Sequence, residues 1–251
     1  IACPSRECAM GTTGCSCKVL GPEIISLSSS KTADGAAYIG ELRGSQRHGS
    51  GSQVWPDGGR YEGQWFNDKA HGRGQYRHPN GDVYNGDWVA DRAHGQGVYQ
   101  HADGSRYVGQ FVDDHQEGKG VETWPDGVLY EGEYFGGCKH GHGKFTYADG
   151  SCYDGGFKEN NIHGEGRYVW SGGREYKGQW QDNQTHGRGF FRWPDGRSYD
   201  GEYRSDRKEG HGIFRWPDGR VYEGQWLDGK QHGQGVYSTP QGQSRRGEWA
   251  D

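Results

Sequence analysis

Aromatic and polar residues alternate along most of this chain in a pattern that repeats every 23 residues. Tyrosines recur at this interval without an insertion, and a glycine stands two residues after each of them. The tyrosine column comprises Tyr38, Tyr61, Tyr84, Tyr107, Tyr130, Tyr153, Tyr176, Tyr199 and Tyr222. A fixed period of about 20 to 50 residues is the signature of a repeat array. The pattern therefore predicts one structural unit repeated in tandem.

Each unit is expected to form a β-hairpin. Tyr61, Gly63 and Trp65 occupy alternate positions, so they share one face of a first strand while polar residues take the other face. The polar and variable residues 66–70 are typical of a hairpin loop. In the second strand Gly74 and Tyr76 again share a face, and aromatic residues recur at the equivalent positions of later units.

Asp-Gly or Asn-Gly dipeptides close most units, and they supply the positive φ that tight hairpin turns require. They stand at residues 57–58, 80–81, 103–104, 126–127, 149–150, 195–196 and 218–219. Glycine normally weakens a strand interior. Here Gly63 lies between two aromatic residues on one face, so its missing side chain leaves room for neighbouring rings. The sequence therefore predicts a close-packed aromatic layer.

The unit resembles the MORN (membrane occupation and recognition nexus) repeat, whose pattern is Tyr-x-Gly-x-aromatic, a short polar loop, then His/Glu-Gly-x-Gly. Residues 222–226 with 232–235, and 61–65 with 71–74, carry the resemblance. Nine complete copies run from about Ala37 to Gln243, and a tenth begins at residues 247–249. The resemblance implies an all-β fold, an elongated single-layer antiparallel sheet of tandem hairpins. At about 4.8 Å per strand, nine units would extend roughly 85 Å.

Residues 1–36 are expected to form a tail or linker, and residues 37–251 the repeat array. The tail contains four cysteines, Cys3, Cys8, Cys15 and Cys17, followed by Gly-Pro and serine-rich segments. Four alternatives stay open for these cysteines: no dedicated chemistry, acylation, pairing with one another, or zinc binding. Their spacing matches none of the paired-cysteine zinc patterns. Acylation would make the tail a membrane tether.

Composition excludes a conventional aliphatic core. Hydrophobic residues make up 30% of the chain, Met occurs once and Gly 48 times. The aromatic content of 14%, held in strict register, also argues against disorder, so aromatic rows must hold the chain together.

The distribution of charge and apolar residues excludes two classes of function. The net charge is −5, and acidic and basic residues are interspersed. No basic stripe suited to nucleic acid is present. No apolar run approaches the roughly 18 residues of a transmembrane helix, so the array is not expected to span a bilayer.

No catalytic residue, metal ligand or cofactor is predicted. Seven histidines stand in one column, at positions 48, 71, 94, 140, 163, 186 and 232. Equivalent positions in successive hairpins lie about 10 Å apart, whereas zinc ligands lie about 2 Å from their ion, so neighbouring histidines cannot share a metal. Glu117 and Glu209 replace two members, which favours a residue that hydrogen-bonds or caps the second strand. The carboxylates recur in similar surroundings, and no nucleophile or phosphate-binding motif is present, so the chain is predicted not to be an enzyme.

Cys138 and Cys152 lie in and beside the fifth unit, separated by a strand and a turn. They are expected to be free thiols, which suits an intracellular, reducing setting.

The sequence favours a non-catalytic scaffold that binds partner proteins through an aromatic-lined groove or through the ends of the array. A single-layer ribbon cannot cover its own apolar face, and extended aromatic surface marks a partner site. The expected partner is a helix or an extended segment, and the open sheet ends allow a homodimer or a place in a larger complex. The predicted partner-binding residues are Trp65, Trp88, Phe111, Trp124, Tyr134, Phe157, Trp170, Trp180, Trp193, Tyr203, Trp216 and Trp226.

The resemblance implies a cytoskeletal, ciliary or membrane-associated assembly inside the cell. One alternative is a membrane tether anchored through an acylated cysteine tail; another is a regulatory part of a lipid kinase or methyltransferase. Direct lipid binding by the array is disfavoured because the loops at residues 89–93 and 227–231 lack clustered basic residues. The chain begins at Ile1 and stops within a tenth copy, so it is expected to be processed or a fragment, and the organelle is left unassigned.

Overall fold

The alternation of aromatic and polar residues produces one short and one longer strand in each repeat. The hairpin that begins at Tyr61 consists of β4 (Arg60–Phe66, 7 residues) and β5 (Lys69–Arg77, 9 residues). The computed structural model describes residues 25–31 and 35–250. Within these residues the secondary structure is strand and turn, with no helix.

The same hairpin recurs along the sheet. The strands are β1 (Ile25–Lys31), β2 (Ala37–Arg43), β3 (Gln46–Val54), β4 (Arg60–Phe66), β5 (Lys69–Arg77), β6 (Val83–Val89), β7 (Arg92–Gln100), β8 (Arg106–Val112), β9 (His115–Thr123), β10 (Leu129–Phe135), β11 (Cys138–Thr146), β12 (Cys152–Lys158), β13 (Asn161–Val169), β14 (Glu175–Gln181), β15 (Gln184–Arg192), β16 (Ser198–Arg204), β17 (Arg207–Arg215), β18 (Val221–Leu227), β19 (Lys230–Ser238) and β20 (Ser244–Trp249).

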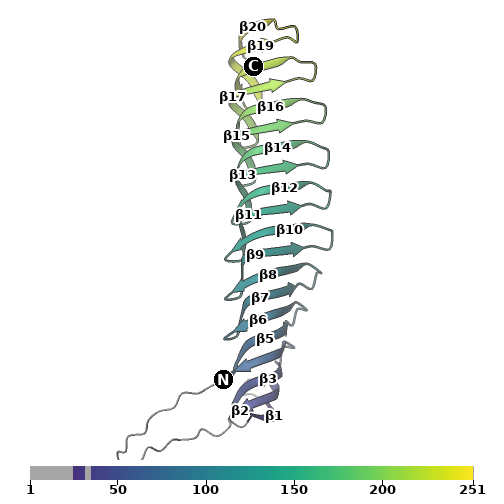
Figure 1. Cartoon of the computed structure of the whole chain (residues 1–251), viewed down its shortest axis with the longest axis vertical. Helices are drawn as coiled ribbons and strands as arrows, with labels where there is room; N and C mark the ends of the chain where they lie inside the picture. The colour runs from purple at the N-terminus through teal and green to yellow at the C-terminus, as the bar shows by residue number, and fades with distance from the viewer. Residues whose placement is uncertain (1–24, 32–34, 251) are drawn as a thin grey trace, which may run out of the picture.

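Each strand from β2 to β19 pairs antiparallel with the strand before it and the strand after it, and with β1 and β20 they make a 20-stranded sheet. The strands lie across the long axis, so the molecule is a long, narrow, twisted ribbon with β1 and β20 at opposite ends (Figure 1). The predicted fold, an elongated open antiparallel sheet of tandem hairpins, is confirmed.

The turn inside each hairpin is shorter than the sequence indicated. Residues 66–70 were expected to form a loop, but β4 ends at Phe66 and β5 begins at Lys69. The turn consists of Asn67 and Asp68, with φ of 47° and 67°. Two consecutive left-handed residues form the tight turn whose twist matches that of the flanking strands.

A second kind of turn joins one hairpin to the next. The Trp55 amide donates to the Gly59 carbonyl at 2.8 Å, and the Gly58 amide donates to the Trp55 carbonyl at 3.0 Å. Gly58 has a φ of 93°, so the Asp-Gly dipeptide does place its glycine in the left-handed region. Residues 171–173, Ser-Gly-Gly, stand where other repeats have the Asp-Gly turn, and they keep the same bonding, since the Gly173 amide donates to the Trp170 carbonyl at 2.8 Å.

The predicted aromatic layer is present, and it rests on glycine. Tyr61 is buried and its hydroxyl donates to the Gln64 carbonyl at 2.8 Å. A Cβ added at Gly63 would lie 2.7 Å from that hydroxyl oxygen, and one added at Gly74 on the paired strand would overlap the ring. The Tyr61 ring also meets the rings of Trp65 and Trp88 edge-on, at centroid distances of 4.9 and 5.2 Å. Each tyrosine therefore joins two successive repeats.

The sheet extends one strand beyond the expected start of the array. β1 pairs with β2 from Ile25 opposite Arg43 to Lys31 opposite Ala37. The sequence indicated no strand before Ala37, so this pairing is an addition to the expected array. The division into a tail at 1–36 and an array at 37–251 otherwise stays a prediction, and Cys3, Cys8, Cys15 and Cys17 lie outside the described residues.

Candidate partner-binding groove

One face of the sheet carries aromatic residues in every repeat, but most of the predicted binding residues lie deep in it. The predicted residues on the first strands have exposed fractions between 3% and 8%. They are Trp65, Trp88, Phe111, Tyr134, Phe157, Trp180, Tyr203 and Trp226. The Trp88 indole is further held by a bond from its Nε1 to the Gly74 carbonyl, at 3.0 Å. These residues form the floor of the face, and their role in partner binding stays a prediction.

The predicted tryptophans of the return strands are more accessible. Trp124, Trp170, Trp193 and Trp216 are half-buried and pack against the core cluster from its edge. Trp170 contacts Phe191 of the next repeat at a centroid distance of 5.4 Å. These rings therefore line one edge of the aromatic floor.

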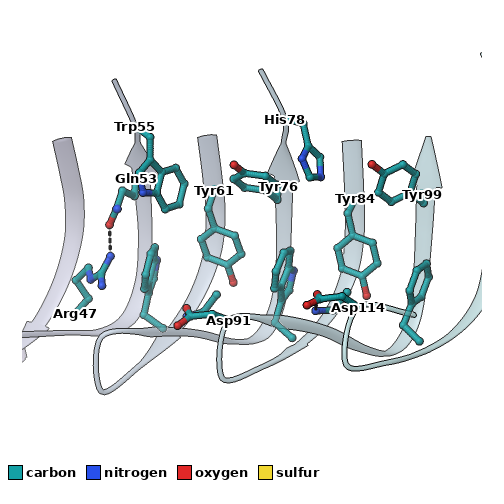
Figure 2. A pocket seen from close by; sticks show the side chains of 15 residues that line it. Arg47, Gln53, Trp55, Tyr61, Tyr76, His78, Tyr84, Asp91, Tyr99 and Asp114 are labelled. Carbon is teal, nitrogen blue, oxygen red and sulfur yellow. Dashed lines mark hydrogen bonds between the residues drawn. The ribbon is translucent and has the colours of Figure 1, made fainter. Parts of the chain in front are cut away.

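The face is hollowed at its N-terminal end, where a groove of about 830 Å³ runs across successive repeats (Figure 2). Three of its lining residues, Trp65, Trp88 and Phe111, are among the predicted partner-binding residues. The other lining residues are Arg47, Gln53, Trp55, Tyr61, Ala70, Tyr76, His78, Tyr84, Asp91, Ala93, Tyr99 and Asp114. The remaining predicted residues lie further along the ribbon and outside this groove.

The groove is open because of one column of residues, two positions after the hairpin turn, which we call column 47. Its members are Arg47, Ala70, Ala93, Gln116, Lys139, Ile162, Thr185, Lys208 and Gln231. The groove lies where the column is alanine. Where the column holds arginine or lysine, the cationic group lies over the aromatic rings, as Arg47 does at 4.3 Å from the Trp65 centroid.

Lys139 shows the arrangement with a carboxylate. Its Nζ lies 2.6 Å from Glu122 Oε2, and both side chains are 15% exposed. The ammonium also lies 5.0 Å from the Tyr130 ring and 5.1 Å from the Trp124 ring. The Tyr134 hydroxyl donates to the same carboxylate oxygen at 3.0 Å. The carboxylate oxygen Glu122 Oε2 therefore accepts two hydrogen bonds, which helps to offset the cost of burying the ion pair.

Lys208 shows the arrangement without a carboxylate. Its Nζ lies between 4.7 and 5.3 Å from the rings of Trp193, Tyr199, Phe214 and Trp226. No carboxylate of the described residues pairs with it. Burial, helped by the nearby Arg197 guanidinium, lowers the pKa of Lys208 to about 8. Four rings therefore do not compensate fully for the water that the ammonium has lost.

The second residue of each hairpin turn in the groove is an aspartate that is hydrogen-bonded to the preceding return strand. Asp91 Oδ1 accepts a bond from the Ala70 amide at 2.7 Å, and the Asp91 amide donates to the Ala70 carbonyl at 3.0 Å. Asp114 bonds Ala93 in the same way, at 2.7 Å. Figure 2 shows both carboxylates beside the turn, on the side to which the Tyr61 and Tyr84 hydroxyls point.

The tyrosines of the groove are neutral hydrogen-bonding groups. Burial raises the pKa of Tyr61 and of Tyr84, and the carboxylates of Asp91 and Asp87 add to it. Burial and a hydrogen bond to Asp82 raise the pKa of Tyr99 to about 12. At neutral pH the negative charge in the groove therefore comes from the aspartates.

The histidine column lies on the opposite face and packs against exposed apolar residues. Phe66 stands between His48 and His71, at centroid distances of 5.2 and 5.7 Å. The expected hydrogen-bonding role is seen at the two glutamates of the column, because Glu117 Oε2 accepts the Gly136 amide at 2.9 Å and Glu209 Oε2 accepts the Asp228 amide at 3.3 Å. The Nδ1 atoms of His48 and His94 are buried and have no hydrogen-bond partner among the described residues. In the described part of the chain no group of histidine, cysteine and carboxylate side chains is arranged to hold a metal.

Two further features bear on the alternatives for the chain. Cys138 and Cys152 are half-buried free thiols, as expected. Residues 25–31 and 35–250 contain no helix of the length and apolarity needed to cross a membrane.

Column 47, Asp91 and Asp114 were not predicted as site residues because residues 66–70 were expected to form a loop. Once the strand begins at Lys69, alternation places Ala70 on the aromatic face. The signal was present, since arginine and lysine appear in this column together with alanine and isoleucine. Such a mixture is typical of a position that faces a partly filled cavity.

The MORN repeat family model matches nine consecutive segments of the chain, residues 38–60, 61–83, 84–106, 107–128, 130–152, 153–173, 176–196, 199–219 and 222–244. The comparison with curated proteins gave no match.

Among solved structures, the chain is similar to the TCP10 domain of Danio rerio CPAP in complex with a peptide of Danio rerio STIL, at 14% identity and a TM-score of 0.44, over 89% of this chain and 100% of that one. It is also similar to the G-box domain of the microcephaly protein CPAP, at 15% identity and a TM-score of 0.43, over 80% and 100% of the two chains. A third is the SAS-4 TCP domain of Drosophila melanogaster with a proline-rich motif of Ana2, at 12% identity and a TM-score of 0.30, over 96% and 99%. At these TM-scores the similarities carry no argument about this chain.

Proposed function

Because the chain belongs to the MORN repeat family, we propose that it is a non-catalytic scaffold that binds partner proteins through the aromatic groove of its N-terminal repeats. The observation that supports this most directly is the groove itself, about 830 Å³ in volume and lined by rings from successive repeats. Aromatic side chains dominate the energetics of protein interfaces because each buries a large apolar area at a small cost in conformational entropy.

The groove suits a polypeptide better than a small molecule undergoing a reaction. Its ionisable groups recur from repeat to repeat, so no carboxylate pair is placed in contrasting surroundings as acid–base chemistry requires. Its lining residues come from successive repeats, so it crosses several strands, as a bound helix or extended segment would (Figure 2). This geometry favours recognition over catalysis.

The wider setting is also part of the proposal. We place the chain within a larger intracellular assembly, cytoskeletal, ciliary or membrane-associated, as the resemblance of its repeats implies. The proposal includes pairing with a second copy of the chain or a place in a larger complex. The nine predicted aromatic residues that lie outside the groove extend the proposal along the rest of the ribbon.

Crosslinking and mass spectrometry of the protein purified from its native source will test the groove. The decisive variant is Tyr76→Gln with Tyr99→Gln, because Gln53 occupies the same column and shows that the strand tolerates glutamine there. We expect the wild type to form crosslinks from Lys69 to one or a few proteins, and the double variant to lose them. Truncation of an aromatic residue that is a hot spot of an interface costs about 2 kcal/mol or more of binding free energy.

Tyr237→Gln, in the same column but outside the groove, serves as the matched control and should keep the crosslinks. Crosslinks from Lys69 that survive in the double variant would refute binding at the groove. Recovery of the wild type without protein partners, in a membrane fraction and acylated on its N-terminal cysteines, would refute the scaffold and support the tether.

A further inference from the structure

We infer that the groove contains two empty subsites for cationic side chains of a bound polypeptide, one over Ala70 and one over Ala93. The inference rests on the proposed function, because it names the chemistry of the partner that the same groove would accept. It comes from a comparison of the chain with itself: one repeat holds its own cation, and the next two keep the surrounding groups without it.

Arg47 is the internal model of an occupied subsite. Its guanidinium lies over Trp65 at 4.3 Å from the ring centroid, and its Nε lies 3.3 Å from Asp68 Oδ1. Its Nη1 donates to the Gln53 side-chain carbonyl, which Figure 2 marks with a dashed line, and its Nη2 donates to the Asp68 backbone carbonyl. An aromatic ring, a carboxylate and a polar side chain therefore surround the cation.

The next repeat repeats this arrangement with the cation removed. Ala70 stands in the position of Arg47, Trp88 in that of Trp65 and Asp91 in that of Asp68. Asp91 Oδ1 accepts the Ala70 amide at 2.7 Å, as Asp68 Oδ1 accepts the Arg47 amide at 2.8 Å. The carboxylate is therefore held in the same place. Tyr76 stands where Gln53 stands, but its hydroxyl lies beside Gly59, so this subsite keeps the ring and the carboxylate of the Arg47 arrangement.

The repeat after that offers a second subsite of the same kind. Ala93 takes the place of the arginine, Phe111 supplies the ring, and Asp114 accepts the Ala93 amide at 2.7 Å. Within residues 25–31 and 35–250, neither Asp91 nor Asp114 forms an ion pair with a lysine, an arginine or a histidine. Ala93, Phe111 and Asp114 all line the groove.

The two lysines of column 47 show why the carboxylate matters. Lys139, beside Glu122, is held in an ion pair at 2.6 Å. Lys208 stands opposite Gly229, which offers no side chain, and burial lowers its pKa. Rings alone therefore leave a buried ammonium disfavoured, whereas rings with a carboxylate accept it. The subsites over Ala70 and Ala93 have both components.

The spacing of the subsites fixes the pattern of the ligand. Equivalent positions in successive repeats are two strands apart, which is about 10 Å. A polyproline II segment brings residues three apart to the same side at about 9.3 Å. A helix brings residues seven apart to the same side at about 10.5 Å. The partner segment should thus carry lysine or arginine pairs at a spacing of three or seven.

A random dodecapeptide library displayed on phage, selected against the full chain, will test the inference. The wild type should enrich peptides with lysine or arginine pairs at these spacings. A synthetic copy of an enriched peptide is then titrated against Asp91→Asn with Asp114→Asn. Asparagine keeps the turn, because Asn160 and Asn183 make the same bond in this chain at 2.8 Å. We expect affinity to fall at least about tenfold, as when one partner of a desolvated charge pair is neutralised.

Three matched measurements complete the test. Replacing the arginines of the peptide by citrulline should weaken binding by a similar factor, and Ala70→Arg with Ala93→Arg should block binding by filling both subsites as Arg47 does. Asp206→Asn, outside the groove, should leave the affinity unchanged.

The possible failures can be told apart. Enriched peptides without basic pairs whose binding still depends on Tyr76 and Tyr99 would overturn the cationic subsites and leave the groove as a protein-binding site. Peptides whose binding ignores the Tyr76→Gln and Tyr99→Gln changes, or a selection that enriches none, would overturn the subsites and count against the groove as well.

Discussion

Two lysines at equivalent positions of this chain experience different electrostatic surroundings because of single neighbouring residues. Lys139 has Glu122 at 2.6 Å, whereas Lys208 has rings on every side and no carboxylate partner among the described residues. The difference cannot be deduced from the composition of either repeat, since both are rich in acidic residues. It follows from the return-strand residue that lies 17 positions before the lysine, which is Glu122 for Lys139 and Phe191 for Lys208.

Lys208 should make stability depend on alkaline pH. The folded pKa is lowered from 10.5 to about 8. Between these two values the unfolded chain keeps a proton that the folded chain has released, so the free energy of unfolding rises with pH across this window. Below about pH 8 the lysine is charged in both states and its penalty is fully present.

The reference variant is Lys208→Gln, since Gln116 and Gln231 occupy the same column. We expect the free energy of unfolding of the wild type, measured relative to this variant by urea denaturation, to rise between about pH 8 and pH 10.5. Parallel pH profiles for the two proteins would show that Lys208 has an ordinary pKa in the folded chain.

The aromatic floor could be predicted from the sequence residue by residue, while the role of column 47 could not. Tyr61, Gly63 and Trp65 alternate within a strand whose pattern is unmistakable, so their common face follows from strand geometry. Ala70 and Asp91 lie beside a turn, where the assignment of one residue to strand or loop decides which face it occupies. The sequence pattern alone does not determine where the strand begins after the turn.

At the scale of the hairpin, the turn acts as a link between repeats as well as a reversal of the chain. Its second residue bonds the backbone of the preceding hairpin through both its amide and its side chain, as Asp206 does with Thr185 at 3.1 and 2.8 Å. Gly137 and Gly229 keep the amide bond and lack the side-chain bond. The link is therefore strongest where the turn carries aspartate or asparagine.

Replacing Asp206 by alanine should destabilise the array. The Thr185 amide and hydroxyl both bond Asp206 Oδ1, at 2.8 and 3.2 Å, and the aspartate has a left-handed φ of 66° that alanine adopts less readily. We expect a loss of about 1 to 3 kcal/mol in the free energy of unfolding, measured by chemical denaturation. Asp206→Asn should lie close to the wild type, and equal losses in the two variants would refute the role of the side-chain acceptor.

The hairpins themselves were predictable from the 23-residue period, and their lengths were not. Residues 67 and 68 adopt left-handed φ although neither is glycine. Asparagine and aspartate tolerate that region better than other residues, but Asn-Asp reads equally well as part of a longer polar loop. The bonds to the preceding repeat, 21 residues away, select the tighter turn.

At the scale of the whole molecule, each repeat contacts the repeats on either side and little else. Strand pairing links neighbours along the chain throughout the described sheet. The aromatic contacts join a repeat only to the adjacent repeat, as Tyr61 does with Trp88. The stability of such an array is approximately a sum of the stabilities of its repeats and of the contacts between neighbours.

Removal of one whole unit should therefore be tolerated. Deletion of residues 153–175 brings Cys152 next to Tyr176 and keeps every aromatic residue on its face. Deletion of residues 153–174 shifts the register by one residue and moves the aromatic positions to the opposite face. We expect the first variant to melt cooperatively with native circular dichroism and the second to lose its fold or aggregate. Similar behaviour of the two would contradict the dependence on register.

The orientation of the strands also determines how the ribbon would respond to mechanical load. Because the strands lie across the long axis, tension applied to the two ends pulls neighbouring strands apart along the direction of their backbone hydrogen bonds (Figure 1). The bonds of one strand pair then carry the force in succession and open like a zip, so hairpins would yield one at a time from an end. Each released repeat would replace about 10 Å of ribbon with roughly 75 Å of extended chain. Placed between two pulling structures, the array would behave as an extensible tether that limits the force it transmits.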